Sequence, residues 1–331
     1  MATMDTRTSL SALFLCWVTL PVDAQLPHRR TGDLYVGDFE NDRVVVYDPG
    51  GAYQGAFGAA GLDGPRGICF LPDGRFCVAS ENTDTVLLFS RGHALLGTLG
   101  HPQLDGPTGM ALSPAGELHV ASFNNGRVLV FDLASGFERV YSAPGLSTPN
   151  CVTFDAAGGI FVSSASRDSL FAFTPAETFV QEFTGGGLDS PMGIARDVND
   201  DLYVAGGLSN NLVKFRTDGT YLGQITHADL MVPQGLAFDE RGHLFSSSYS
   251  LDQVVEFDAS GAYVRTIVAG GLDAPRSLAF ARRGPREGST GSTPLLPAGP
   301  LTPLVIGGGP PVATAVLLLD LVARAERRLA E

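Results

Sequence analysis

Apolar and polar positions alternate in short runs along residues 33–281. Residues 107–148 show the pattern clearly, with apolar or alternating runs at 109–113, 117–122, 127–132 and around 137–142. Glycine, proline, asparagine and aspartate stand in the turns between these runs. Short alternating runs bounded by such turns are typical of β-strands. The pattern predicts four short strands in this stretch.

The same pattern returns at a fixed interval along the chain. Six prolines follow one another 42 residues apart, with a leucine three residues before each: Pro65, Pro107, Pro149, Pro191, Pro233 and Pro275. Four strands of about five or six residues, with their turns, fill a unit of this length. Each unit is therefore predicted to be one four-stranded blade of a β-propeller.

Large apolar residues recur in two columns at the repeat interval. The first column ends the third strand of each unit, at Tyr47, Phe89, Phe131, Phe173, Phe215 and Phe257. The second lies in the fourth strand, at Tyr53, Leu95, Phe137, Phe179, Tyr221 and Tyr263. Such columns indicate packing between adjacent blades, so we predict that both belong to the core.

The two ends of the repeat region complete each other. Residues 65–274 hold five whole units, residues 33–64 supply only the last three strands of a unit, and residues 275–281 supply only a first strand. Joining both ends in one blade leaves no open seam in the ring. We therefore predict an all-β fold, a six-bladed propeller over residues 33–282 that is closed by N- and C-terminal strands sharing one blade.

The residues of the repeat resemble the NHL family of propeller repeats. The stretches 33–51 and 117–132 carry the resemblance, and the Asn-x-Arg element of the repeat stands at Asn41/Arg43 and Asn125/Arg127. The resemblance implies a six-bladed propeller. Six-bladed relatives include lyases similar to streptogramin lyase and lactonases similar to gluconolactonase, whose metal is held at the channel mouth by acidic, Asn or His side chains.

The segments outside the ring have a different composition. Arg7, an apolar run at 10–20 and Val22-Asp23-Ala24 predict a signal peptide over residues 1–24, hence a secreted, periplasmic or cell-surface protein. Residues 283–311 are predicted to be a disordered Gly/Pro/Ser/Thr linker, and residues 312–331 a C-terminal helix. This tail is the one segment that could contact a membrane, and we favour the interpretation that it does not. We expect a monomer.

Net charge limits the partners. The chain has a formal charge of −13 and a single lysine, Lys214, which argues against binding a phosphate backbone. We expect no nucleic-acid partner.

Three cysteines lie in the ring. Cys69 is expected opposite Cys77 on a hairpin, where the two form either a disulfide or, as we favour, a pair of small buried residues. Cys151 replaces the glycine found in four other units and is predicted to be an unpaired thiol beside the channel.

The residue after each repeat proline is predicted to ring the mouth of the central channel. These positions hold Arg66, Thr108, Asn150, Met192, Gln234 and Arg276. Arg66 and Arg276 should converge on neighbouring blades, where they could bind a carboxylate, sulfate or phosphate with help from Asn150 and Gln234. Alternatively, Asp63 and Asp273 neutralise the two arginines as surface ion pairs, which is the interpretation that we favour.

Loops between the second and third strands supply further candidate binding residues. Phe39, Phe123 and Tyr249 occupy the same place in three units. Exposed aromatics among polar neighbours suit recognition of a protein or carbohydrate. Packing within the loops explains them equally well.

No histidine stands at the six mouth positions. We therefore expect no catalytic residue, metal or cofactor, and predict a scaffold that binds a protein or a small anionic or carbohydrate ligand through the channel mouth and the loop-rich face. The alternative is a divalent-metal lyase or lactonase-type hydrolase, with Ca²⁺ or Mg²⁺ on Asn150 and either Glu81 or Asp38. One residue remains unexplained: Arg196 replaces an apolar residue of the innermost strand and is predicted to be buried, where it needs a partner that the sequence does not identify.

Overall fold

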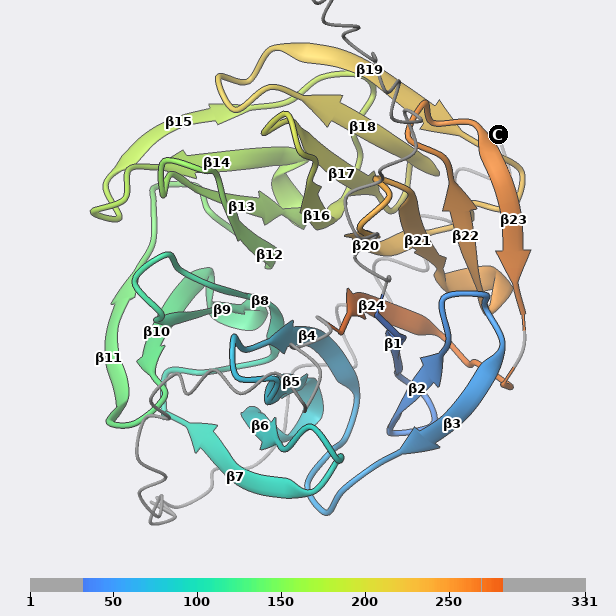
Figure 1. Ribbon diagram of the computed structural model, residues 1–331. Coiled ribbons are helices and arrows are strands. Elements are labelled where there is room, and N and C mark those ends of the chain that lie inside the picture. The colour runs from blue at the N-terminus through green and yellow to red at the C-terminus, as the bar shows by residue number, and fades with distance from the viewer. Residues whose placement is uncertain (1–31, 269, 282–331) are drawn as a thin grey trace, which may run out of the picture. The chain divides into compact units, whose positions relative to one another are not determined.

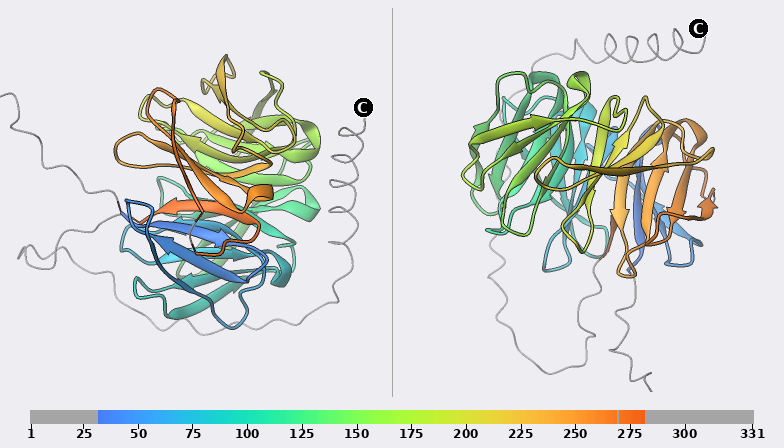
Figure 2. Two further views of the ribbon diagram at one scale, coloured as in Figure 1. Left: turned by 90° about the vertical axis from the view of Figure 1, so that its right-hand side faces the viewer. Right: turned by 90° about the horizontal axis from the view of Figure 1, so that it is seen from above.

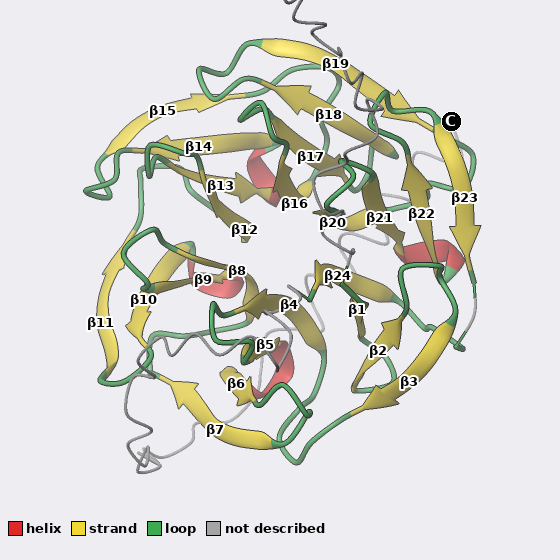
Figure 3. Cartoon of the chain, viewed as in Figure 1, coloured by secondary structure: helices red, strands yellow, loops and turns green. Residues whose placement is uncertain are grey.

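The computed structural model describes residues 32–268 and 270–281 (Figure 1). These residues form six four-stranded antiparallel sheets arranged around a centre as the blades of a propeller. The predicted fold class is confirmed. Figure 3 shows that strands and turns make up nearly all of the described chain, apart from a few short helical segments.

The strands follow the 42-residue repeat. The N-terminal part of the closing blade and the first blade contain β1 (Leu34–Asp38), β2 (Arg43–Tyr47), β3 (Tyr53–Phe57), β4 (Pro65–Phe70), β5 (Phe76–Ser80), β6 (Thr85–Phe89) and β7 (Leu95–Gly100). The next two blades contain β8 (Pro107–Leu112), β9 (Leu118–Ser122), β10 (Arg127–Asp132), β11 (Gly136–Tyr141), β12 (Pro149–Phe154), β13 (Ile160–Ser164), β14 (Ser169–Phe173) and β15 (Phe179–Phe183). The last strands are β16 (Pro191–Arg196), β17 (Leu202–Gly206), β18 (Asn211–Phe215), β19 (Tyr221–Thr226), β20 (Pro233–Phe238), β21 (Leu244–Ser248), β22 (Gln253–Phe257), β23 (Tyr263–Ile267) and β24 (Pro275–Phe280).

Single turns of 3₁₀ helix follow the second strand in four blades. They are η1 (Glu81–Thr83), η2 (Phe123–Asn125), η3 (Ala165–Arg167) and η4 (Tyr249–Leu251). In the two views of Figure 2, the turns of the blades gather at the two faces of the ring. The end of the second strand lies opposite the start of the innermost strand: Ser80, the last residue of β5, pairs with Pro65, the first residue of β4. The 3₁₀ turns and the starts of the innermost strands therefore lie on the same face of the ring.

The ring is closed by strands from both ends of the repeat region. The closing sheet has the order β24-β1-β2-β3, and β1 pairs with β24 from Leu34 opposite Phe280 onwards. Strand β24 also packs against β4 and β20, the innermost strands of the adjoining blades. The predicted shared blade is confirmed, and it brings residues near 276 beside residues near 66.

The two columns of large apolar residues differ in burial. The third-strand column, Tyr47 to Phe257, is almost completely buried in the clusters between blades, as predicted. The fourth-strand column was wrongly assigned to the core, because Tyr53, Tyr221 and Tyr263 are each more than 40% exposed. The fourth strand is the outer edge of each blade, so its rings touch the buried column by one edge only, as Tyr53 does with Tyr47.

Each innermost strand carries a β-bulge directly after its proline. In the first blade Pro65 lies opposite Ser80 and Ile68 opposite Val78, so Arg66 and Gly67 share a single partner. Equivalent register shifts occur in the other five blades. A bulge turns a side chain out of the regular ladder. The bulge therefore explains why the side chain after each proline leaves the ladder of its blade.

Two further predictions concern cysteine and arginine. Cys69 lies directly opposite Cys77, as expected, and the two do not form a disulfide. The predicted burial of Arg196 is wrong: it is exposed, and its partner, which the sequence did not identify, is Asp200 in an ion pair. Arg196 is the last residue of β16, where the strand leaves the interior and its side chain reaches water.

The predicted signal peptide (1–24), linker (283–311) and C-terminal helix (312–331) lie outside the described residues, as does Arg282. Within residues 32–268 and 270–281, no helix has the length and apolar character needed to cross a membrane.

Candidate functional site

The innermost strands of the six blades surround a central cavity of about 190 Å³. Five of the six predicted mouth residues line it: Arg66, Thr108, Asn150, Gln234 and Arg276. The sixth, Met192, is buried instead in an apolar cluster with Ala205 and Leu230. The next layer of the lining consists of Gly67, Gly109, Cys151, Gly193, Gly235 and Ser277.

The glycines of this second layer permit the close approach of neighbouring blades. A Cβ atom at Gly67 would lie 2.3 Å from the carbonyl oxygen of Thr108, and one at Gly193 would lie 2.4 Å from that of Gln234. Only a residue without a side chain fits at such a distance. The repeat of glycine two residues after the proline is therefore a packing requirement, and Cys151 and Ser277 are its two exceptions.

Arg66 and Arg276 come from adjacent strands, β4 and β24, and their guanidinium groups converge as predicted. Each residue is only 8% exposed. The guanidinium carbons of Arg66 and Arg276 lie 5.9 and 4.6 Å from the centre of the same ring, that of Phe39. Burial, with a further contribution from the positive charge of Arg66, lowers the pKa of Arg276 to about 10.

The two arginines differ in their partners. Arg66 forms a buried ion pair with Glu81 at the start of η1, with 2.6 Å between Nε and a carboxylate oxygen. Arg276 forms no ion pair within the described residues; its Nη1 donates a hydrogen bond of 3.3 Å to the side-chain oxygen of Gln234. The three charged groups, Arg66, Arg276 and Glu81, therefore leave an excess of one positive charge. We call these three residues the mouth cluster.

The predicted surface ion pairs with Asp63 and Asp273 are wrong. Asp63 accepts a hydrogen bond from the side chain of Asn82 instead. The bulge after the proline turns each arginine inward, away from the aspartate that precedes the proline in the sequence. Glu81, considered above only as a metal ligand, is the actual partner of Arg66.

The three loop aromatics pack against the arginines. Arg276 lies between Phe39 and Tyr249, with its guanidinium carbon 4.6 and 4.2 Å from the two ring centres. The ring centre of Phe123 lies 5.8 Å from the guanidinium carbon of Arg66. Phe39 and Phe123 are buried and Tyr249 is half-buried, so the expectation of exposed aromatics is wrong. Loop packing explains them, with a cation–π contact that holds the guanidinium groups in place.

Several polar atoms of the cavity wall have no hydrogen-bond partner among the described residues. They are Nε of Arg276, Nδ2 of Asn150 and Oγ of Ser277. Buried polar groups are nearly always satisfied, so unpartnered ones call for an explanation. Both nitrogens can only donate. Ser277 was not among the predicted site residues, although the sequence places its hydroxyl in a column otherwise made of glycine and one cysteine.

The carboxylates proposed for a divalent cation already have cationic partners. Asp38 is fully buried, pairs with Arg43 and accepts a hydrogen bond from Asn41. Glu81 is paired with Arg66. Neither carboxylate is thus available beside Asn150 without first releasing an arginine, so this ligand set does not fit a cation.

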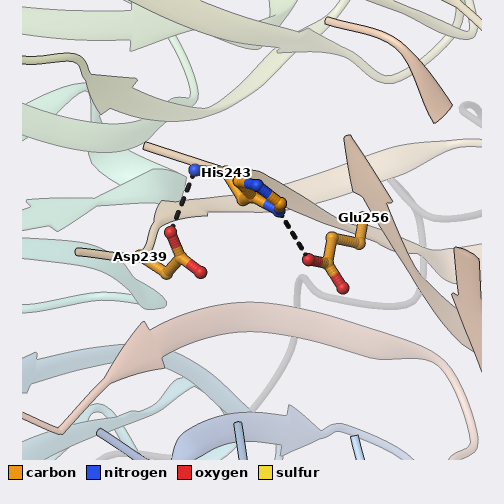
Figure 4. Close-up of side chains that lie close together, drawn as sticks. All are labelled: Asp239, His243 and Glu256. Atoms are coloured by element: carbon orange, nitrogen blue, oxygen red, sulfur yellow. Dashed lines mark hydrogen bonds and ion pairs between the residues drawn. The ribbon is translucent and has the colours of Figure 1, made fainter. Parts of the chain in front are cut away.

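A second acidic group lies at the opposite end of β20 from the mouth. Asp239, His243 and Glu256 approach one another closely (Figure 4). Arg241 pairs with both carboxylates, at 2.7 Å from Asp239 and 3.2 Å from Glu256, and Arg265 pairs with Glu256 as well. We call these five residues the far-face cluster. Its two acids are balanced by two arginines, so a metal ion would have to displace Arg241 from both.

Cys151 lines the cavity as predicted. Burial raises the pKa of its thiol to about 11, so the thiol is protonated at neutral pH. No histidine contributes to the described lining of the cavity.

Comparisons with known proteins support the fold. The chain has 14% identity and a TM-score of 0.60 with a catalytically inactive virginiamycin B lyase from Staphylococcus aureus, solved with quinupristin, over 77% of this chain and 94% of that one. A streptogramin B lyase structure gives 14% and 0.60 over 78% and 92%. A chain of a nidogen/laminin complex gives 15% and 0.65 over 75% and 98%.

These similar structures include an enzyme and a component of a protein complex, and at this level of identity they show the six-bladed propeller fold alone. No family model and no curated protein matches the chain. The resemblance to NHL repeats therefore stays a prediction.

Proposed function

We propose that this chain is an exported, non-catalytic propeller with NHL-type repeats that binds an anionic ligand at the mouth of its central channel. One observation carries the proposal. Arg276 and Asn150, each 8% exposed, line a central cavity, and each carries a buried N–H donor without a hydrogen-bond partner among the described residues. An unpaired buried donor costs about 1–3 kcal/mol, and an anion would satisfy several such donors at once.

The charge of the mouth cluster supports an anion over a cation. Two guanidinium groups and one carboxylate leave one positive charge uncompensated in a buried place. A buried charge is stabilised when a partner of opposite sign neutralises it. The chain as a whole carries a charge of −13, so attraction to this site is local and does not extend to a polyanion such as nucleic acid.

The chemistry of the lining favours binding over catalysis. A general base needs a proton acceptor with a pKa near the working pH. The described lining offers a thiol whose pKa is raised to about 11, an amide, hydroxyls and guanidinium groups. Glu81, the carboxylate of the mouth cluster, is held in an ion pair with Arg66. These groups are suited to hold a charge in place.

The test is anion-dependent thermal stability of the full chain. Acetate, phosphate and sulfate are added at matched ionic strength, and the melting temperature is compared with that in chloride. We expect at least one of these anions to raise the melting temperature of the wild type. In Arg276→Met this increase should be lost, because the donor and the uncompensated charge are both removed.

Arg196→Met is the matched control. Like Arg276, Arg196 belongs to an innermost strand. It is the last residue of β16, is exposed and is paired with Asp200. The control should respond to anions like the wild type. Equal loss of the response in both variants, or no response of the wild type to any of the anions, would contradict the proposal.

A further inference from the structure

Accepting that the mouth binds an anion, we propose that its ligand is a small monocarboxylate that carries a second, uncharged hydrogen-bond acceptor at its other end. The inference rests on the proposed function and adds the chemical class of the ligand. Three features of the cavity carry it: the charge balance, the positions of the unpartnered donors and the volume.

The charge balance selects a single negative charge. The buried charges of Arg66, Arg276 and Glu81 sum to one positive charge, and a monoanion brings these three groups to neutrality. Glu40, whose charge also acts on Arg276, is exposed to water and therefore screened. A dianion such as phosphate or sulfate would leave a net negative charge next to Glu81, which is only 5% exposed. Like charges in a buried place are unfavourable. The planar carboxylate also matches the geometry of a guanidinium group.

The unpartnered donors lie on two sides of the cavity. Arg276 and Ser277 are neighbours on β24, whereas Asn150 is on β12. Strand β24 packs against β4 and β20, and β12 packs against β8 and β16, so these two strands face each other across the ring (Figure 1). A carboxylate on Arg276 and Ser277 thus leaves the amide of Asn150 for a different part of the ligand.

Asn150 requires an acceptor, because the unpartnered atom is the N–H-bearing Nδ2. A second carboxylate there would add a charge that the mouth cluster does not balance. A ketone, hydroxyl or amide oxygen satisfies the donor without charge. By contrast, the hydroxyl of Thr108 in the same ring is already used, since it donates to the carbonyl oxygen of Pro149 at 3.1 Å.

The volume limits the size of the ligand. A cavity of about 190 Å³ is below the range of sites for drug-sized molecules. A ligand smaller than a drug-sized molecule is therefore expected.

The test uses calorimetric titration of the full chain with a matched set of acids. Pentanoate has the carboxylate alone, 4-oxopentanoate adds an uncharged acceptor at the far end, and succinate adds a second charge. We expect 4-oxopentanoate to bind at least 10-fold more tightly than either of the others. In Asn150→Ala this advantage over pentanoate should disappear while pentanoate binds as before. Arg276→Met should weaken both.

Arg196→Met is again the control, since its side chain is exposed at the end of β16 and paired with Asp200, and it should keep the preference for 4-oxopentanoate. Alkylation of Cys151 by iodoacetamide, followed by peptide mass spectrometry so that Cys69 and Cys77 are measured separately, locates the ligand. Bound 4-oxopentanoate should slow the reaction at Cys151, which lines the cavity next to Asn150.

The outcomes separate the two proposals. If anions stabilise the wild type through Arg276 but the oxo acid has no advantage, or keeps it in Asn150→Ala, the inference is wrong and the proposed function stands. If a peptide with an acidic side chain binds at Arg276 and the small acids do not, the ligand is a protein and the inference is again wrong. If no anion acts through Arg276, both are wrong.

Discussion

The mouth cluster and the far-face cluster both place arginines against buried acids, yet they are balanced differently. In the far-face cluster, Asp239 and Glu256 face Arg241 and Arg265, so the two negative charges meet two positive ones. In the mouth cluster, Glu81 pairs with Arg66, and Arg276 has no ion-pair partner among the described residues. Both clusters contain nearly buried groups.

The difference teaches where a ligand is to be expected. A cluster that is neutral by itself and fully hydrogen-bonded gains little from an added ion, although three of its residues have the types and spacing of metal ligands. A cluster with an uncompensated charge and unpartnered donors is stabilised by a ligand that supplies what is missing. Residue types alone would have selected the far-face cluster.

The largest effect is expected from Glu81→Gln. This change removes the only carboxylate of the mouth cluster and leaves two guanidinium groups buried beside each other. Breaking a buried pair by removing one partner costs about 3–5 kcal/mol, because the other charge stays uncompensated. Urea denaturation should show a loss of this size in the free energy of unfolding.

Glu240→Gln is the matched control for Glu81, since Glu240 is an exposed glutamate in the turn after β20, at the opposite end of that strand from the mouth. It should change the free energy of unfolding by less than about 0.5 kcal/mol. If Glu81→Gln were as stable as this control, the arginines would not be buried charges and the contrast between the clusters would fail.

A pH titration extends the comparison to a third buried group, His119. This side chain is 2% exposed between the blades and exchanges a hydrogen bond of 3.1 Å with the hydroxyl of Tyr141. Burial lowers its pKa to about 4, below the unfolded value of 6.5, in spite of Glu117 at 4.0 Å. The neutral form therefore contributes stability that is complete above pH 6.5 and is lost progressively as the pH falls toward 4.

The loss expected from His119 is about 3 kcal/mol by pH 4, since one pKa unit corresponds to about 1.4 kcal/mol. His119→Phe restores the aromatic residue found as Phe161 and Phe245 at this place in other blades. The difference in unfolding free energy between wild type and variant, measured at pH 7 and at pH 4, should change by this amount. A constant difference would mean that the histidine is not excluded from water.

The smallest effect is expected from Glu256→Gln in the far-face cluster. Its arginines are about one third to one half exposed, so water can solvate them once the carboxylate is gone. Losing hydrogen bonds between charged groups costs about 1.5–3 kcal/mol, and this value should appear in urea denaturation. The response to anions should remain that of the wild type.

Glu240→Gln serves as the control for Glu256, since Glu240 is an exposed acid in the turn between β20 and β21, beside Asp239, and it should leave stability unchanged within about 0.5 kcal/mol. A loss of the anion response in Glu256→Gln would show that the two clusters are coupled and not independent.

The sequence by itself determined the architecture. The spacing of Pro65, Pro107 and their counterparts, with alternating runs between them, is enough to predict four strands per unit and a shared closing blade. Local alternation is a physical signal of a strand with two unlike faces, and a constant period forces the same packing in every unit. The sequence also predicted the convergence of Arg66 and Arg276. The two incomplete end units must share one blade, and this closure places the strand of Arg276 beside the strand of Arg66.

Tertiary structure alone decided burial and partners. The bulge after each proline turns Arg66 away from Asp63, three residues before it, and toward Glu81 in the next loop. Arg196 was expected inside and lies in water, and the fourth-strand column was expected in the core and forms the outer edges. Position within a repeat specifies a strand and a face, whereas burial and charge balance depend on which groups the closed ring brings together around one cavity.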